Sequence, residues 1–351
     1  MPELVAPSDA SAPDQTTVEQ GRGGSLNRVK RVLFPAVRLL VAAAIVAAVA
    51  WTTVNEWSQV RHTFSTLAWE SVVLALLAAV AGIGAGMMSW RSALHDLGHE
   101  VPVLTAGRIN LVGQLGKYVP GSVWAYVLQM ELGRRAGLPR ARAFLASVVS
   151  VGLGVTAGLV VGILGLPALF DAARGPDAST GRFALYVLVG LVPVALVCAH
   201  PRVLTRLVNL FLRVLRRQPL GHDLSWRGVL RTIGWAAVAY ACFGLHLWLL
   251  ANAQAAPGVG GIVRSVGAMA LAMTVSVFAV VAPSGLGVRE GILTAALTPY
   301  LGSPGLAFSV ALVSRLIFTV ADVIAAGGAA LSGVRYLKHT QPAHVQPTTE
   351  E

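Results

Sequence analysis

The sequence predicts an all-α protein that crosses a membrane several times. Hydrophobic residues make up 55% of the chain, charged residues only 12%, and the mean hydropathy is +0.67. A water-soluble surface requires more charge than this composition supplies. Seven apolar stretches are long enough to span lipid, and Gly285–Leu301 is a weaker eighth. The seven are Phe34–Trp51, Val72–Trp90, Phe144–Leu166, Phe183–Ala199, Ile233–Ala251, Val266–Val281 and Leu306–Leu331.

The net charge of +11 reflects membrane topology rather than binding to nucleic acid. The basic residues lie almost wholly in short loops beside the apolar stretches, as the positive-inside rule describes. We expect four clusters to lie in the cytoplasm: Arg22 to Arg38, Arg91 to Arg142, Arg202 to Arg231, and Arg335 with Lys338. A transmembrane domain over 34–335 is thus predicted between disordered cytoplasmic tails, 1–33 and 336–351.

Two further segments, each broken at its middle by proline and glycine, are predicted to form re-entrant helical hairpins. Residues 105–134 lie between basic clusters on the same side, so they must enter the membrane and return, with Pro120 and Gly121 at the tip. Residues 266–302 must begin and end outside, which a second hairpin with its tip at 283–285 satisfies. The result is six full transmembrane helices plus two hairpins, in an inverted repeat of residues 34–168 and 183–333. Charge counting equally allows eight transmembrane helices, with two full crossings over 266–301.

Both predicted tips are rich in proline and glycine and have charged residues beside them. Lipid offers no water to a freed backbone amide, so irregular backbone at membrane depth lies packed in protein or lines a cavity. Before the first tip, Asn110, Gln114 and Lys117 are spaced to share one helix face, and Tyr126 belongs to a similar series after it. These residues either line a cavity for an anionic head group or form the wet face of an interfacial helix.

At the second tip, Arg289 and Glu290 follow Gly285 and Gly287 within apolar surroundings. Ionisable groups at such positions are costly, and they are usually functional or paired. The alternative to a ligand site is a pairing with the last helix, where Arg315 and Asp322 are seven residues apart and share a face. We favour charge-balancing roles for Glu290, Arg315 and Asp322. Arg289 is the better ligand-binding candidate, because its planar guanidinium can donate two parallel hydrogen bonds to a phosphate.

Residues 202–217 resemble an interfacial helix. Arg202, Arg206, Arg213 and Arg217 share one face, and apolar residues occupy another. Such a helix is attracted to an anionic leaflet, although a cytoplasmic extension of the preceding helix has the same pattern.

Other chemistries have little support in the sequence. The glycines at 285 and 287 lack the strand–helix context of a nucleotide loop, and no Gly-Lys-Ser/Thr sequence occurs. His95 and His99 are better explained by a solvated loop than by a metal site. No catalytic serine, cysteine or carboxylate set stands out, so we expect neither an enzyme nor a cofactor.

The two tips carry a resemblance to a known family. Gly-Lys-Tyr-Val-Pro-Gly at 116–121 and Pro-Ser-Gly-Leu-Gly-Val-Arg-Glu at 283–290 resemble the paired motifs of the lysylphosphatidylglycerol synthase transmembrane region, also called flippase-like or UPF0104 proteins. The resemblance spans roughly 34–335. The best-known members fuse this region to a cytosolic aminoacyl-transferase domain, which we expect this chain to lack. The resemblance therefore implies lipid translocation, or an accessory role in envelope glycolipid synthesis, rather than lipid synthesis.

The sequence as a whole indicates a lipid translocase of the bacterial inner membrane with both termini in the cytoplasm. Its expected ligand is an anionic phospholipid or a polyprenyl-phosphate-type lipid. Lys117 and Arg289 would bind the phosphate, while Asn110, Gln114 and Tyr126 would hydrogen-bond the head group. With no ATP site visible, movement would be passive or ion-coupled. The alternative is a non-transporting partner of an envelope-lipid enzyme.

Overall fold

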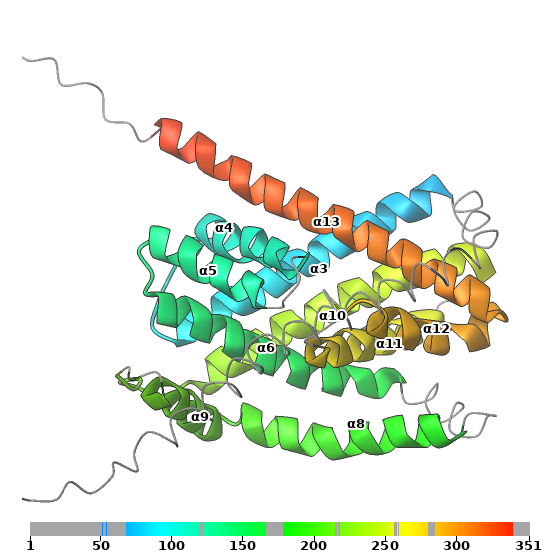
Figure 1. Ribbon diagram of the computed structural model, residues 1–351, viewed down its shortest axis with the longest axis horizontal. Coiled ribbons are helices and arrows are strands. Elements are labelled where there is room, and N and C mark those ends of the chain that lie inside the picture. The colour runs from blue at the N-terminus through cyan, green and yellow to red at the C-terminus, as the bar shows by residue number, and fades with distance from the viewer. Residues whose placement is uncertain are drawn as a thin grey trace, which may run out of the picture.

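The described part of the computed structural model is built from helices (Figure 1). The predicted first helix, Phe34–Trp51, lies outside it except for Trp51, and so do Pro120 and Gly121 of the first tip. The structure describes residues 51, 54, 68–118, 123–165, 178–214, 216, 218–255, 258, 260–279 and 285–339.

Five of the described helices are long and apolar enough to cross a membrane, which confirms a multi-pass membrane protein. They are α3 (Trp69–Asp96), α6 (Arg140–Gly162), α10 (Trp226–Ala255), α11 (Gly260–Phe278) and α13 (Pro304–His339). A sixth candidate combines α8 (Ala178–Ala199) with α9 (Pro201–Val214). The helix α13 continues to His339, beyond the predicted end of the last apolar stretch and into the expected C-terminal tail.

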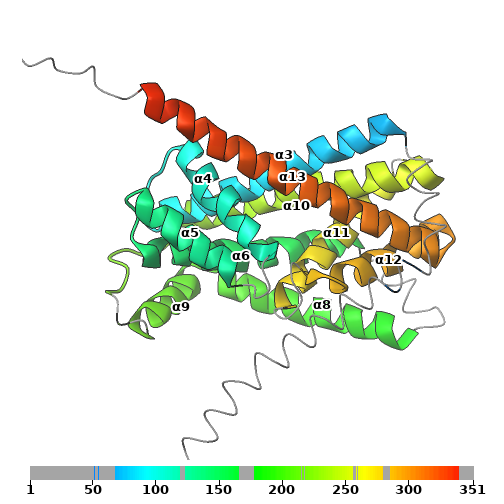
Figure 2. The same ribbon diagram turned by 45° about the horizontal axis from the view of Figure 1, so that its top comes forward.

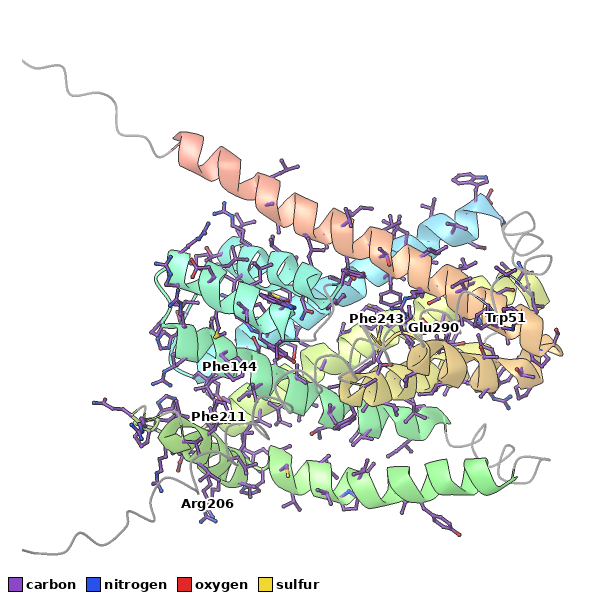
Figure 3. The ribbon with its side chains drawn as sticks, viewed as in Figure 1. Trp51, Phe144, Arg206, Phe211, Phe243 and Glu290 are labelled. Carbon is purple, nitrogen blue, oxygen red and sulfur yellow. The ribbon has the colours of Figure 1, made fainter. Side chains whose placement is uncertain are left out.

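The helix α9 lies at 79° to the end of α8. Pro201 begins α9, and a proline cannot continue the preceding helix because it lacks an N–H and clashes with the previous turn. Val208 and Leu212 are buried against the protein, whereas Arg202 and Arg213 are exposed. Arg206 also points away from the bundle (Figure 3). The predicted separation of basic and apolar faces is thus confirmed for the described residues of α9.

The first broken stretch folds as a helical hairpin of α4 (Val103–Gln114), the 3₁₀ turn η2 (Leu115–Tyr118) and α5 (Trp124–Arg135). Each arm has 12 residues and rises about 18 Å, less than the hydrocarbon thickness of about 30 Å. Gly116 permits the close approach of the arms, since a Cβ there would lie 2.6 Å from the backbone nitrogen of Ala125. The arms therefore pack backbone to backbone near the tip.

The second broken stretch pairs α11 with α12 (Val288–Leu301). Gly285 and Gly287 precede α12 with φ of 66° and 84°, a left-handed backbone that side chains with a Cβ rarely adopt. Gly287 N–H donates to Glu290 Oε2 at 2.7 Å, which caps the helix. The α12 helix has only 14 residues and ends at Gly302, also with positive φ.

The two hairpins lie toward opposite ends of the long axis of the molecule, and α13 runs diagonally past both (Figures 1 and 2). The early part of α13 packs against α12, and its later part packs against α4. Behind α13, α3 and α10 form the most extensive helix pair. One apolar core surrounds Trp90 and Leu145, and a second surrounds Leu247 and Met269.

Close helix packing depends on particular glycines, and Gly267 provides a test. A Cβ on Gly267 would lie 2.2 Å from the backbone nitrogen of Gly165, an atom that cannot move without shifting its chain. We expect Gly267→Ala to lower the free energy of unfolding by about 1–3 kcal/mol, the usual cost of overpacking. Denaturation in mixed micelles measures this.

The matched control is Gly152→Ala on α6, where a Cβ meets nothing within 4 Å. Alanine favours a helix over glycine, so this variant should be neutral or slightly stabilised. An equal effect of both substitutions would contradict the packing explanation.

Candidate functional site

The η2 turn, which is the described part of the first tip, is bound to α13 through Asp322. Lys117 Nζ lies 2.6 Å from Asp322 Oδ2, and the Tyr118 hydroxyl donates to the same oxygen at 2.6 Å. The Asp322 side chain is 6% exposed, but that of Lys117 is 30% exposed. The η2 turn makes this contact possible, because it continues α4 for one tighter turn and carries both residues to α13.

The start of α12, with Gly285 and Gly287 as the described part of the second tip, is bound to α13 through Arg315. Arg315 Nη1 donates to Glu290 Oε1 at 2.5 Å, and both side chains are largely buried. Glu290 thus uses one carboxylate oxygen for Arg315 and the other for the cap at Gly287. The structure places Glu290 and Asp322 in ion pairs with different partners, Arg315 and Lys117.

Arg289 lies beside these pairs, but its guanidinium makes no salt bridge with a carboxylate of the described residues. It is 7% exposed and lies over the ring of Phe318, with Cζ 4.1 Å from the centroid. Nη2 donates to Ser314 Oγ at 3.3 Å, and the buried Nε has no hydrogen-bond partner. A buried cation with so few polar partners is costly in an apolar interior.

A hydrogen-bonded chain that the sequence did not predict extends from Arg289 through Ser314 to His246. His246 Nδ1 lies 2.9 Å from Ala75 O, and its Nε2 lies 2.9 Å from Ser314 Oγ. A carbonyl only accepts, so Nδ1 carries the proton and Nε2 of the neutral ring accepts from Ser314. The sequence offered one signal for this chain, a histidine within the apolar stretch 233–251, where an ionisable residue is unusual.

The two tips meet a short stretch of α13. Ser314 and Asp322 are eight residues apart, a rise of about 12 Å along the helix. Glu290 lies near this central part of the molecule (Figure 3). Two segments separated by about 170 residues of sequence thus contribute Lys117 and Arg289 to neighbouring parts of one helix.

The remaining predicted residues lie at varying distances from this region. Asn110 is buried on α4, and Gln114 is half-buried at its end. Tyr126 packs edge-on against Phe144 of α6, with centroids 5.9 Å apart, and Figure 3 shows Phe144 well separated from Glu290. Gln129, from the same α5 series, hydrogen-bonds Ser147 of α6. The contact described for Tyr126 is thus with α6.

The outer end of the first hairpin carries a separate exposed cluster around Glu131. Its carboxylate accepts from Arg134 at 2.7 Å and from Arg140 at 2.8 Å. Hydrogen bonds from Arg134, and then from Arg140, hold the pKa of Glu131 well below its usual value. The cluster joins the end of α5 to the start of α6, and it includes none of the tip residues.

The described geometry comprises two broken helices whose tips bind one transmembrane helix and enclose an arginine without a carboxylate partner in the described chain. No curated protein matches this chain. A family model described as "Lysylphosphatidylglycerol synthase TM region" matches residues 36–326. This match covers most of the sequence and includes both tips, and the chain belongs to that family.

Proposed function

We propose that the protein translocates an anionic lipid whose phosphate binds between the two tips, against the middle of α13. The buried guanidinium of Arg289 carries the proposal, because its Nε has no partner in the described residues. A phosphate oxygen would supply both the hydrogen bond and the countercharge. Lys117 is the second phosphate ligand, since its partly exposed amine lies on the opposing tip.

In this proposal the two hairpins are re-entrant and enter the membrane from opposite sides. The 12-residue arms of the first hairpin support this, because they are too short to cross lipid. The 14-residue α12 supports it for the second hairpin. The protein lies in the bacterial inner membrane with its termini in the cytoplasm, and it moves lipid without catalysing a covalent reaction. Broken helices in other transporters bind substrates in this way.

Lipid identification by native mass spectrometry tests the site. We expect the wild type to retain an anionic lipid that Arg289→Gln loses. Arg213→Gln, an exposed arginine of α9, controls for general attraction of lipid to basic surface. Equal retention by all three proteins would overturn the site assignment.

Reconstitution with a fluorescent analogue of the retained lipid then tests movement. A chemical quencher added outside removes the fluorescence of the outer leaflet only. The fluorescence of probe that starts in the inner leaflet should therefore be lost faster with wild type than with Arg289→Gln. Binding without any movement would support the accessory role beside an envelope-lipid enzyme instead.

A further inference from the structure

The ion pair between Lys117 and Asp322 is asymmetric in its exposure. Lys117 is 30% exposed, whereas Asp322 is 6% exposed and belongs to the membrane-spanning α13. Both Lys117 and Tyr118 contact a single oxygen, Oδ2. An incoming anion can therefore reach the lysine, but it cannot replace the lysine as a partner of the buried carboxylate.

The exchange of Lys117 from Asp322 to a lipid phosphate would leave a buried carboxylate with one neutral donor, Tyr118. An ionised carboxyl group without a cationic partner is strongly disfavoured at such a position. The same group is stable when protonated, because burial penalises only the charged form. Tyr118 can then turn its hydroxyl to accept from the acid.

We propose that binding of an anionic lipid at the tips is coupled to uptake of one proton by Asp322. The proton comes from a hydronium ion or a buffer acid in bulk water. One bond to hydrogen in that donor breaks as one O–H bond forms on the carboxylate, and no other bond changes. This inference rests on the proposed function and names its coupling ion. Protonated Asp322 no longer attracts Lys117, so the tip remains engaged with the lipid until the proton leaves.

The charged groups around Asp322 are consistent with this assignment. Besides Lys117 and Tyr118 from η2, α12 contributes Arg289, and α13 contributes Arg315, whose carboxylate partner is Glu290. The α4 helix, which packs against α13, carries one charged residue, Arg108, and α10 carries His246, which contacts α13 through Ser314. The α3 helix has no charged or histidine residue between Glu70 and Arg91. Asp322 is thus the carboxylate that loses its ion-pair partner when Lys117 binds the lipid phosphate instead.

The test measures binding and proton uptake together on the full-length protein in detergent. A short-chain phosphatidylglycerol is added to weakly buffered protein that contains a pH-indicator dye. We expect proton uptake that approaches one per bound lipid. The lipid affinity, measured from about pH 8 to about pH 5, should rise as the pH falls, and one coupled proton limits the slope to about tenfold per pH unit. The phosphodiester stays ionised throughout this range, so it does not supply the signal.

Asp322→Asn should bind the lipid with a pH-independent affinity and without proton uptake, because the amide mimics the protonated acid. Glu131→Gln, at the exposed cluster, should behave as wild type. Binding by wild type without uptake or pH dependence would overturn the coupling but leave the proposed function intact. Absence of lipid binding to wild type would instead overturn the proposed function. If Asp322→Asn does not fold, the pH dependence of lipid binding by wild type still tests the coupling between lipid binding and proton uptake.

Discussion

Glu290→Gln is expected to lower the free energy of unfolding by about 3 kcal/mol, measured by denaturation in mixed micelles. The amide keeps the shape of the side chain but removes the charge that pairs with Arg315 at 2.5 Å. The guanidinium of Arg315, only 16% exposed, then loses its carboxylate partner on α12. The cap at Gly287 also weakens, because the amide oxygen is a poorer acceptor than a carboxylate.

A double-mutant cycle isolates the pair from these other effects. Combining Glu290→Gln with Arg315→Met removes both charges, so the double variant should be more stable than the sum of the single losses predicts. The matched control is Glu131→Gln, which breaks an exposed ion-pair cluster and should change stability little. Strict additivity of the Glu290 and Arg315 substitutions would show that the pair contributes nothing as a unit.

Arg289→Met is expected to change binding and stability in opposite directions. The variant should bind the anionic lipid about a hundredfold more weakly, as expected for loss of charge-assisted hydrogen bonds. The apo protein should be as stable as wild type or more stable, because methionine packs well beside Phe318 and Met269 and leaves no buried charge. Titration with short-chain phosphatidylglycerol and thermal unfolding measure the two effects.

Arg264→Met provides the control for Arg289→Met. Arg264 lies at the start of α11 in the same hairpin, and it is exposed with its guanidinium over the ring of Tyr300. Its loss should leave the affinity for the lipid unchanged. A marked loss of stability in Arg289→Met, without loss of lipid binding, would assign Arg289 to the fold.

The long helices were predictable because the thickness of lipid dictates the length of an apolar run. The predicted stretches lie within α3, α6, α10 and α13 almost completely, but the helices extend further into polar flanks. Trp69, Arg140 and Trp226 begin helices where the apolar pattern had not yet started. Helix ends depend on local capping and packing, to which a hydropathy pattern is insensitive.

The charged residues of the candidate site were predictable as a set, and the pairing of Glu290 with Arg315 was among the alternatives considered, but the partner of Lys117 was not predicted. A charge in an apolar run is conspicuous in a sequence, and this identified Lys117, Arg289, Glu290, Arg315 and Asp322. The pairing of Lys117 with Asp322 depends on contact between α4 and α13, about 200 residues apart in the chain, which spacing does not encode.

The placement of Tyr126 shows why the first tip was harder to predict. Its series repeats the helical spacing of Asn110, Gln114 and Lys117, so the two polar stripes were expected to converge on the tip. In the structure, α5 packs Tyr126 against Phe144 and Gln129 against Ser147, both on α6. Such contacts between helices are not encoded in the spacing of one helix. Conversely, His246 and Ser314 are single polar residues in long apolar helices, and only the hydrogen-bonded chain from Arg289 through Ser314 to His246 distinguishes them.

The attachment of both tips to one helix has a mechanical consequence. The α13 helix carries Asp322, which pairs with Lys117, and Arg315, which pairs with Glu290. A shift of α13 along its axis would therefore move both ion-pair partners together, toward one hairpin and away from the other. In the proposed function, where the hairpins enter the membrane from opposite sides, opening toward one face would accompany closing toward the other. A single rigid rod would thereby make the two openings mutually exclusive, without a dedicated gate on either side.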